Sequence, residues 1–147
     1  MKSAIVAAVA AAGCSSTTES TPSGDVTIAI QQSLTGQTTS AGTFVLSGAI
    51  SDDGQTTEEL TFGAPLNTPV VPVTFRRVLT GRRGTLTVTG SASLTWTSQT
   101  GGTLSGTWRV ESATGIYSSG SGTFSGTANF AATPPTAALT YLGEINR

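Results

Sequence analysis

Residues 85–97 alternate without a break between apolar or small side chains and hydroxyl side chains. The even positions include Leu86, Val88 and Trp96, and every odd position is Thr or Ser. A period of two places the two sets on opposite faces of a β-strand. An α-helix, with a period of 3.6 residues, would scatter the apolar set around its circumference. This segment is therefore predicted to be a strand with one buried face.

The same alternation recurs along most of the chain. Turn-forming stretches, such as Asp52-Asp53-Gly54 and Gly81–Gly84, join successive apolar runs at hairpin spacing. No segment after residue 25 has the pattern of an amphipathic helix. Further strands are expected at residues 26–32, 43–50, 58–62, 70–79, 103–110, 123–130 and 137–142.

Eight antiparallel strands with short connections form either a barrel or a sandwich. Small residues on the apolar face favour the barrel, because a narrow, strongly coiled interior needs gaps beside its large side chains. These residues are Gly48, Gly90, Gly106 and Gly126. The fold class is thus predicted to be all-β, with an antiparallel eight-stranded barrel that is closed or nearly closed.

Composition narrows the chemistry. The chain has 147 residues, of which 28 are Thr and 18 are Ser, and it has no His. The absence of His excludes imidazole bases and His-ligated metal sites. The formal net charge is −1, so no strong field attracts nucleic acid. We expect no cofactor, no metal site and no nucleic-acid partner.

The N-terminus has the features of an export signal. Lys2 precedes an apolar run, Ala4–Ala12, which is too short to span a bilayer but fits a signal-peptide core. Ala11-Ala12-Gly13-Cys14 resembles the lipobox of bacterial lipoproteins. In that family the chain is cut before the cysteine, whose sulfur then carries a lipid. An ordinary secretory signal that leaves Cys14 as a plain thiol is the alternative.

These features predict three parts of the chain: a signal peptide (1–13), a lipidated Cys14 with a flexible Ser/Thr linker (14–24) and a β-barrel domain (25–147). The linker has no apolar residue that could pack between Ser15 and Gly24. The expected location is extracytoplasmic, anchored to a bacterial membrane through the lipid. A single cysteine also excludes a disulfide within the chain.

Two motifs resemble a known family. Residues 78–88 are similar to a VLTG-x-x-G-T hairpin, and residues 106–124 to a pattern of G-x-W, T-G-x-Y and G-x-G-x-aromatic. Together they resemble the allene oxide cyclase and dirigent-like β-barrels, including small bacterial secreted members, over about residues 43–130. The resemblance implies a calycin-type barrel with an apolar lumen, and homo-oligomers are frequent among the plant members.

Plant members of that family cyclise or steer small hydrophobic molecules. Their cyclases use a polar cluster with a carboxylate and an asparagine deep in the barrel. In this chain Asn129 falls on the hydroxyl face, so it does not correspond to the asparagine of that polar cluster. Glu58 lies at an even position of its strand, like Leu60 and Phe62, and therefore on the same face as these two residues. It is the one carboxylate expected to point inward. It is a speculative catalytic residue.

Other candidates have simpler interpretations. The acidic pairs Asp52-Asp53 and Glu58-Glu59 fit a solvated hairpin tip better than a Ca²⁺ site. Four arginines at 76, 77, 82 and 83 are expected at an exposed edge and turn, or paired with Glu58 and Glu59. The large aromatic residues are expected in the core, and would line a ligand cavity if the lumen is incompletely filled: Phe44, Trp96, Trp108, Tyr117, Phe124 and Phe130.

Three functions follow as hypotheses. The first is a non-catalytic membrane-anchored lipoprotein whose barrel holds a small hydrophobic molecule. The second is a cyclase or isomerase acting on a small hydrophobic substrate. The third is a structural or surface-interaction protein with a filled barrel. A cavity lined by a buried, unpaired carboxylate would favour the second, and a solidly packed lumen the third.

Overall fold

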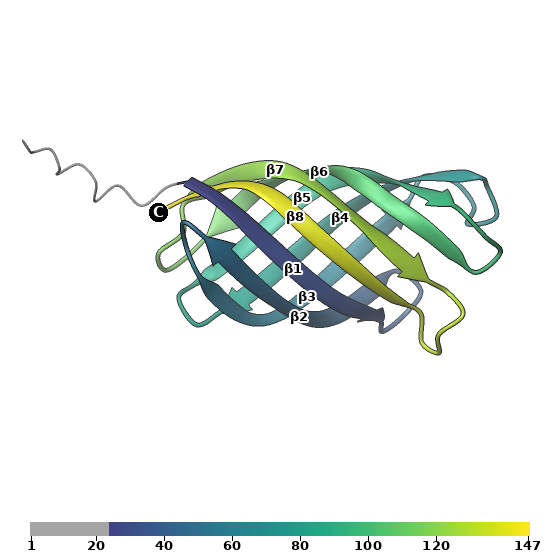
Figure 1. Cartoon of the computed structure of the whole chain (residues 1–147), viewed down its shortest axis with the longest axis horizontal. Coiled ribbons are helices and arrows are strands. Elements are labelled where there is room, and N and C mark those ends of the chain that lie inside the picture. The colour runs from purple at the N-terminus through teal and green to yellow at the C-terminus, as the bar shows by residue number, and fades with distance from the viewer. Residues whose placement is uncertain (1–23) are drawn as a thin grey trace, which may run out of the picture.

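The structure is a computed structural model that describes residues 24–147. The predicted signal peptide (1–13) and residues 14–23 of the predicted linker (14–24), with Cys14, lie outside the described residues, and Gly24 of that linker begins the first strand. The described chain forms a closed barrel in which each strand pairs antiparallel with its neighbours in sequence, and β1 pairs with β8 (Figure 1). The strands are β1 Gly24–Leu34, β2 Thr39–Gly48, β3 Asp52–Phe62, β4 Val70–Gly81, β5 Thr85–Trp96, β6 Gly101–Ala113, β7 Ser119–Asn129 and β8 Thr136–Asn146.

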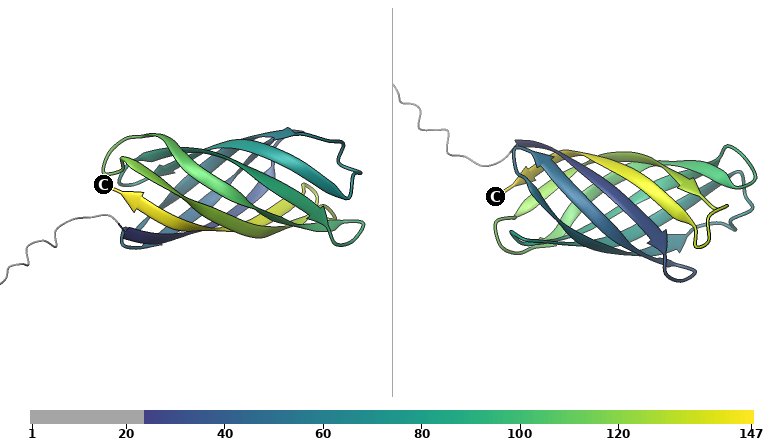
Figure 2. Two further views of the ribbon diagram at one scale, coloured as in Figure 1. Left: turned by 90° about the horizontal axis from the view of Figure 1, so that it is seen from above. Right: turned by 60° about the horizontal axis from the view of Figure 1, so that its bottom comes forward.

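The predicted all-β, eight-stranded closed barrel is confirmed. Every strand coils steeply around the barrel in each view (Figure 2). Alternation along each strand sends apolar side chains inward, as in β4, where Val71, Val73 and Phe75 are buried and Thr74 is exposed. Within residues 24–147, no helix is long and apolar enough to cross a bilayer.

The two ends of the barrel differ. One end, here called the terminal end, holds Gly24, the C-terminus and the connections at 49–51, 82–84 and 114–118 (Figure 1). The opposite end, here called the mouth, holds the connections at 35–38, 63–69, 97–100 and 130–135. The hairpins at the mouth, residues 33–40, 60–72, 93–105 and 126–138, contain no charged residue. The mouth is therefore an uncharged end of the barrel.

Two details of the predicted strands were wrong. Asp52 and Asp53 begin β3 instead of forming the turn, which lies at 49–51. Thr87 is buried rather than exposed, because the register between β5 and β6 shifts at Thr87/Val88. A bulge of this kind breaks strict alternation locally, and nothing in the even–odd pattern signals it.

Candidate ligand-binding site

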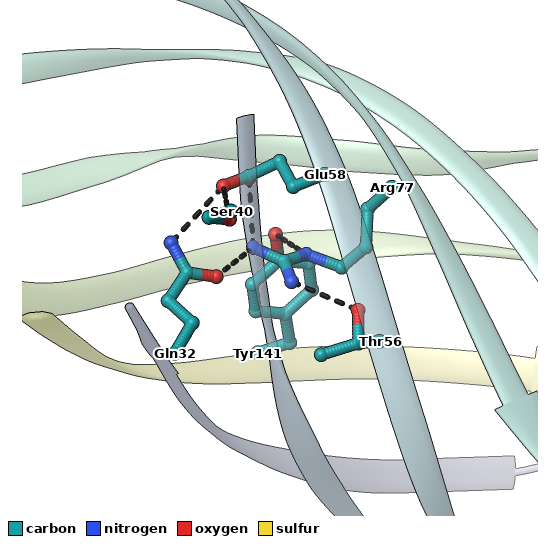
Figure 3. A network of polar contacts seen from close by, with 6 residues as sticks. All are labelled: Gln32, Ser40, Thr56, Glu58, Arg77 and Tyr141. Carbon is teal, nitrogen blue, oxygen red and sulfur yellow. Dashed lines mark hydrogen bonds and ion pairs between the residues drawn. The ribbon is translucent and has the colours of Figure 1, made fainter. Parts of the chain in front are cut away.

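A cluster of polar side chains crosses the inside of the barrel (Figure 3). The cluster comprises Gln32 of β1, Ser40 of β2, Thr56 and Glu58 of β3, Arg77 of β4 and Tyr141 of β8. We call these six residues the lumen cluster. All except Gln32 are buried, and Gln32 is half-buried. Such a group inside a small barrel is stable only if its members satisfy one another.

The alternation and register of the strands bring Arg77 and Glu58 together inside the barrel. Arg77 follows Val71, Val73 and Phe75 on the inward face of β4. Glu58 is its direct partner across the β3–β4 ladder. Ser40 is the partner of Glu58 across β2–β3. These pairings bring the groups together without any loop.

Arg77 lies at the centre of the lumen cluster. Its Nη2 donates to Glu58 Oε2 at 2.7 Å and to Gln32 Oε1 at 2.6 Å. Its Nη1 donates to Thr56 Oγ1 at 2.9 Å, and its Nε donates to Tyr141 Oη at 3.1 Å. Its Cζ is also 5.7 Å from the centre of the Tyr141 ring. Four N–H groups of the guanidinium thus donate hydrogen bonds within the lumen cluster, which fixes its position.

Glu58 accepts three hydrogen bonds. Besides Arg77, Gln32 Nε2 and Ser40 Oγ each donate to Glu58 Oε1 at 3.0 Å. The side chains of Arg77 and Glu58 are 0% and 4% exposed, so this ion pair is shielded from water. A buried carboxylate with this many donors is a fixed structural acceptor.

The neighbouring groups shift each other's protonation. Burial alone would lower the pKa of Arg77, but Tyr141 and Glu58 outweigh burial and raise it. Burial raises the pKa of Tyr141 to about 12; Arg77 opposes this rise and the Glu58 carboxylate adds to it. Arg77 is therefore a permanent cation and Tyr141 a neutral phenol at physiological pH.

A cavity of about 80 Å³ lies between the lumen cluster and the mouth. Only Gln32 and Glu58 of the lumen cluster line it; the other four residues are not among its lining. Its walls are mostly apolar, and exposed Gln37 and Leu66 lie among its lining residues at the mouth. The apolar walls include Leu60, Val73, Phe75, Leu94, Leu104, Phe124 and Leu139. The barrel is therefore neither hollow throughout nor filled throughout.

The aromatic residues singled out from the sequence divide into three groups. Phe124 and Phe130 line the cavity. Trp96 packs on Phe130 with ring centres 4.9 Å apart, and lines a separate hollow at the mouth. Its Nε1 is buried and has no hydrogen-bond acceptor within residues 24–147. Phe44, Trp108 and Tyr117 belong to the buried core and do not line the cavity.

Sequence reasoning placed Glu58 inward, and the structure buries it at the cavity. It missed the rest of the lumen cluster. Arg77 was expected either at an exposed edge or paired with Glu58 or Glu59. The exposed edge was wrong, because Arg77 is fully buried, and the pairing with Glu58 is confirmed. Its position was readable, because Arg77 shares parity with Phe75 and Leu79 in β4. The same alternation places Gln32 in step with buried Ile30 and Tyr141 in step with buried Leu139. The sequence interpretation did not use this signal for the polar residues.

A second polar group closes the terminal end. Asp52 Oδ1 accepts the backbone N–H groups of Asp53 and Arg82, and its Oδ2 accepts the backbone N–H of Arg83 and the Tyr117 hydroxyl. Burial alone would raise the pKa of Asp52, but the hydrogen bonds from Tyr117 and the three backbone groups lower it. Burial, followed by Asp52, raises the pKa of Tyr117. Asp52 thereby ties three connections together and has no access to the cavity.

No protein-family model, no curated protein and no solved structure matches this chain. The residues of the lumen cluster and the cavity are therefore interpreted from their own geometry. Within residues 24–147, acidic side chains form no group able to hold a metal ion.

Proposed function

We propose that this protein is an extracytoplasmic lipoprotein, anchored to a bacterial membrane through Cys14, whose barrel binds a small, mostly apolar molecule. The observation that carries the binding function is the cavity of about 80 Å³, with apolar walls and two polar side chains at one side. Ligand sites have this composition, with apolar lining and a few placed polar groups. Typical pockets for drug-sized ligands measure about 300–1,000 Å³, so this ligand is small.

The proposal of a lipid anchor is based on the sequence. An apolar run of signal-peptide length precedes the only cysteine of the chain. The likeness to allene oxide cyclase and dirigent-like barrels is part of the same proposal. It is supported by the two motifs and by a strand count that agrees with the closed barrel.

The position of Glu58 favours a second candidate function, that of a cyclase or isomerase. Its carboxylate is buried and lines the cavity, as a general base would. It already accepts three hydrogen bonds, however, one of them from Arg77. A Glu58 that took up a proton would leave the fully buried Arg77 without its counter-ion, so the geometry favours binding without catalysis.

Binding is tested with a small neutral alkyl probe, 1-fluorohexane, titrated into the full chain carrying Cys14→Ser and followed by ¹⁹F NMR. Ala128→Leu should abolish binding, because Ala128 is a buried lining residue and the larger side chain fills the cavity. Ala138→Leu is the matched control, since Ala138 shares the outward parity of exposed Thr140 and does not line the cavity. Equal binding to Ala128→Leu, or none to the parent chain, would contradict the binding function.

The anchor is tested in the native chain by cell fractionation. Cys14→Ser should lose lipid labelling and move from the membrane fraction to the soluble fraction. Retention in the membrane fraction would remove the lipoprotein part of the proposal. The catalytic candidate gains support only if the chain turns over a small epoxide or polyene and Glu58→Gln stops turnover while the barrel remains folded.

A further inference from the structure

We infer that the cavity selects an uncharged molecule: a slender apolar body with one terminal hydroxyl or primary amide that bonds to Gln32 and Glu58. This inference rests on the proposed binding function and names the chemical class of its ligand. Three observations carry it: the hydrogen-bonding capacity left at the cavity, the distribution of charge and the size of the space.

Gln32 and Glu58 retain hydrogen-bonding groups that a ligand in the cavity could use. Gln32 Nε2 has two N–H groups and, within residues 24–147, donates one of them, to Glu58. The Glu58 carboxylate has about four acceptor positions and uses three. One amide N–H, one lone pair of Gln32 Oε1 and one carboxylate lone pair thus remain on the two cluster residues that line the cavity. A hydroxyl or a primary amide matches these groups, because each both donates and accepts.

Charge excludes ionic ligands. Arg77 neutralises Glu58 at 2.7 Å, four of its five N–H groups donate to Glu58, Gln32, Thr56 and Tyr141, and Arg77 does not line the cavity. A carboxylate ligand would therefore face Glu58 with no available cation. An ammonium ligand would compete with Arg77 for a carboxylate that is already paired. The mouth hairpins add no charged residue that could compensate. An ionic head group would lose its hydration without gaining a partner.

Size and lining determine the body of the ligand. An apolar cavity of about 150 Å³ binds a single benzene ring. At about 80 Å³ this cavity admits a slender alkyl chain that continues towards the mouth, and no ring system. Its deeper walls are formed by Phe75, Phe124 and Leu139 beside the lumen cluster. Phe75 and Phe124 pack edge to face with ring centres 5.3 Å apart, which fixes that wall.

The test compares four molecules that share one alkyl chain: 1-octanol, octyl methyl ether, octanoate and octylammonium. Each is titrated into the full chain carrying Cys14→Ser by calorimetry, while NMR follows the side-chain amide resonances of Gln32. Octanol should bind about three- to tenfold more tightly than the ether, which cannot donate a hydrogen bond. Both ions should bind more than about tenfold more weakly than octanol. Octanol should also shift the Gln32 amide resonances.

Ala128→Leu and the control Ala138→Leu separate this inference from the binding function. If octanoate or octylammonium binds as tightly as octanol, and Ala128→Leu abolishes that binding, the cavity is a site but the inferred ligand class is wrong. The same conclusion holds if octanol and its ether bind equally, or if the Gln32 resonances do not move. If no molecule binds, both the inference and the binding function fail.

Discussion

Arg77 and Glu58 show how a barrel of this size tolerates a charged pair. Removing two charges from water costs several kcal/mol for each ion, and only close pairing with further hydrogen bonds offsets that cost. Here the guanidinium makes four hydrogen bonds and the carboxylate accepts three. The pair thus behaves as one unit, and each member is stable only with the other.

Breaking this unit should be costly, whereas replacing it whole should not. Arg77→Met leaves Glu58 buried without its cation and should lower the free energy of unfolding by about 3–5 kcal/mol. The double variant Arg77→Met with Glu58→Leu removes both charges and should recover more than half of that loss. Urea unfolding followed by tryptophan fluorescence measures both. Additive losses in the double variant would show that the two residues do not act as a pair.

Asp52 makes the stability of the terminal end depend on pH. Its pKa in the folded chain lies below its ordinary value of 3.8. The ionised carboxylate therefore contributes stability that is complete above this value and is lost as the pH falls through the lower, folded value. Asp52→Asn should unfold more easily than the parent at about pH 7, and the difference should shrink at about pH 2.5.

The control for Asp52 is its neighbour. Asp53 makes an exposed ion pair with Arg82 at 2.8 Å, with side chains 50% and 82% exposed. Exposed pairs contribute less than about 1 kcal/mol, so Asp53→Asn should change stability little at either pH. A penalty for Asp52→Asn that is the same at both pH values would contradict the role given to its charge.

At the scale of the elements, strand count and direction were predictable because alternation extends over whole strands. The thirteen-residue run beginning at Thr85 matches β5, Thr85–Trp96, almost residue for residue. The bulge in β5 was not predictable. The register shift at Thr87/Val88 depends on pairing with β6, which lies beyond the local pattern. Glu58 was predictable by parity, whereas the size of the cavity depends on packing among eight strands.

Gly90 is an element-scale feature of β5. A Cβ built on it would lie 2.0 Å from the Thr107 carbonyl oxygen and 2.8 Å from Phe75 Cζ. The neighbouring strand approaches too closely for any side chain, so Gly90→Ala should destabilise the barrel by about 1–3 kcal/mol. Gly101→Ala is the matched control, because its nearest atom is 3.2 Å away and belongs to the Ser98 side chain. Thermal unfolding of the two variants compares them; equal midpoints would refute the close approach.

At the scale of the whole molecule, the cavity lies at the mouth. The mouth is the end of the barrel opposite to Gly24 and the C-terminus (Figure 1). The eleven residues of β1 rise about 36 Å along the strand, and a tilt of roughly 40° reduces this to about 28 Å along the barrel. Ten peptide units join Cys14 to Gly24 and span at most about 33–36 Å. Bringing the mouth to the anchoring bilayer would require nearly full extension, which is opposed by conformational entropy.

In the proposed lipoprotein, the mouth should therefore face away from the membrane and take its ligand from the aqueous side. Because Cys14 is the only cysteine and carries the lipid in this proposal, Ser118→Cys and Gln99→Cys each introduce one free thiol for a fluorophore. Ser118 is exposed at the terminal end and Gln99 is exposed at the mouth. In vesicles with nitroxide-labelled head groups, the label at position 118 should be quenched several-fold more than the label at position 99. Equal quenching, or stronger quenching at the mouth, would mean that the barrel lies with its opening against the bilayer and draws its ligand from the lipid.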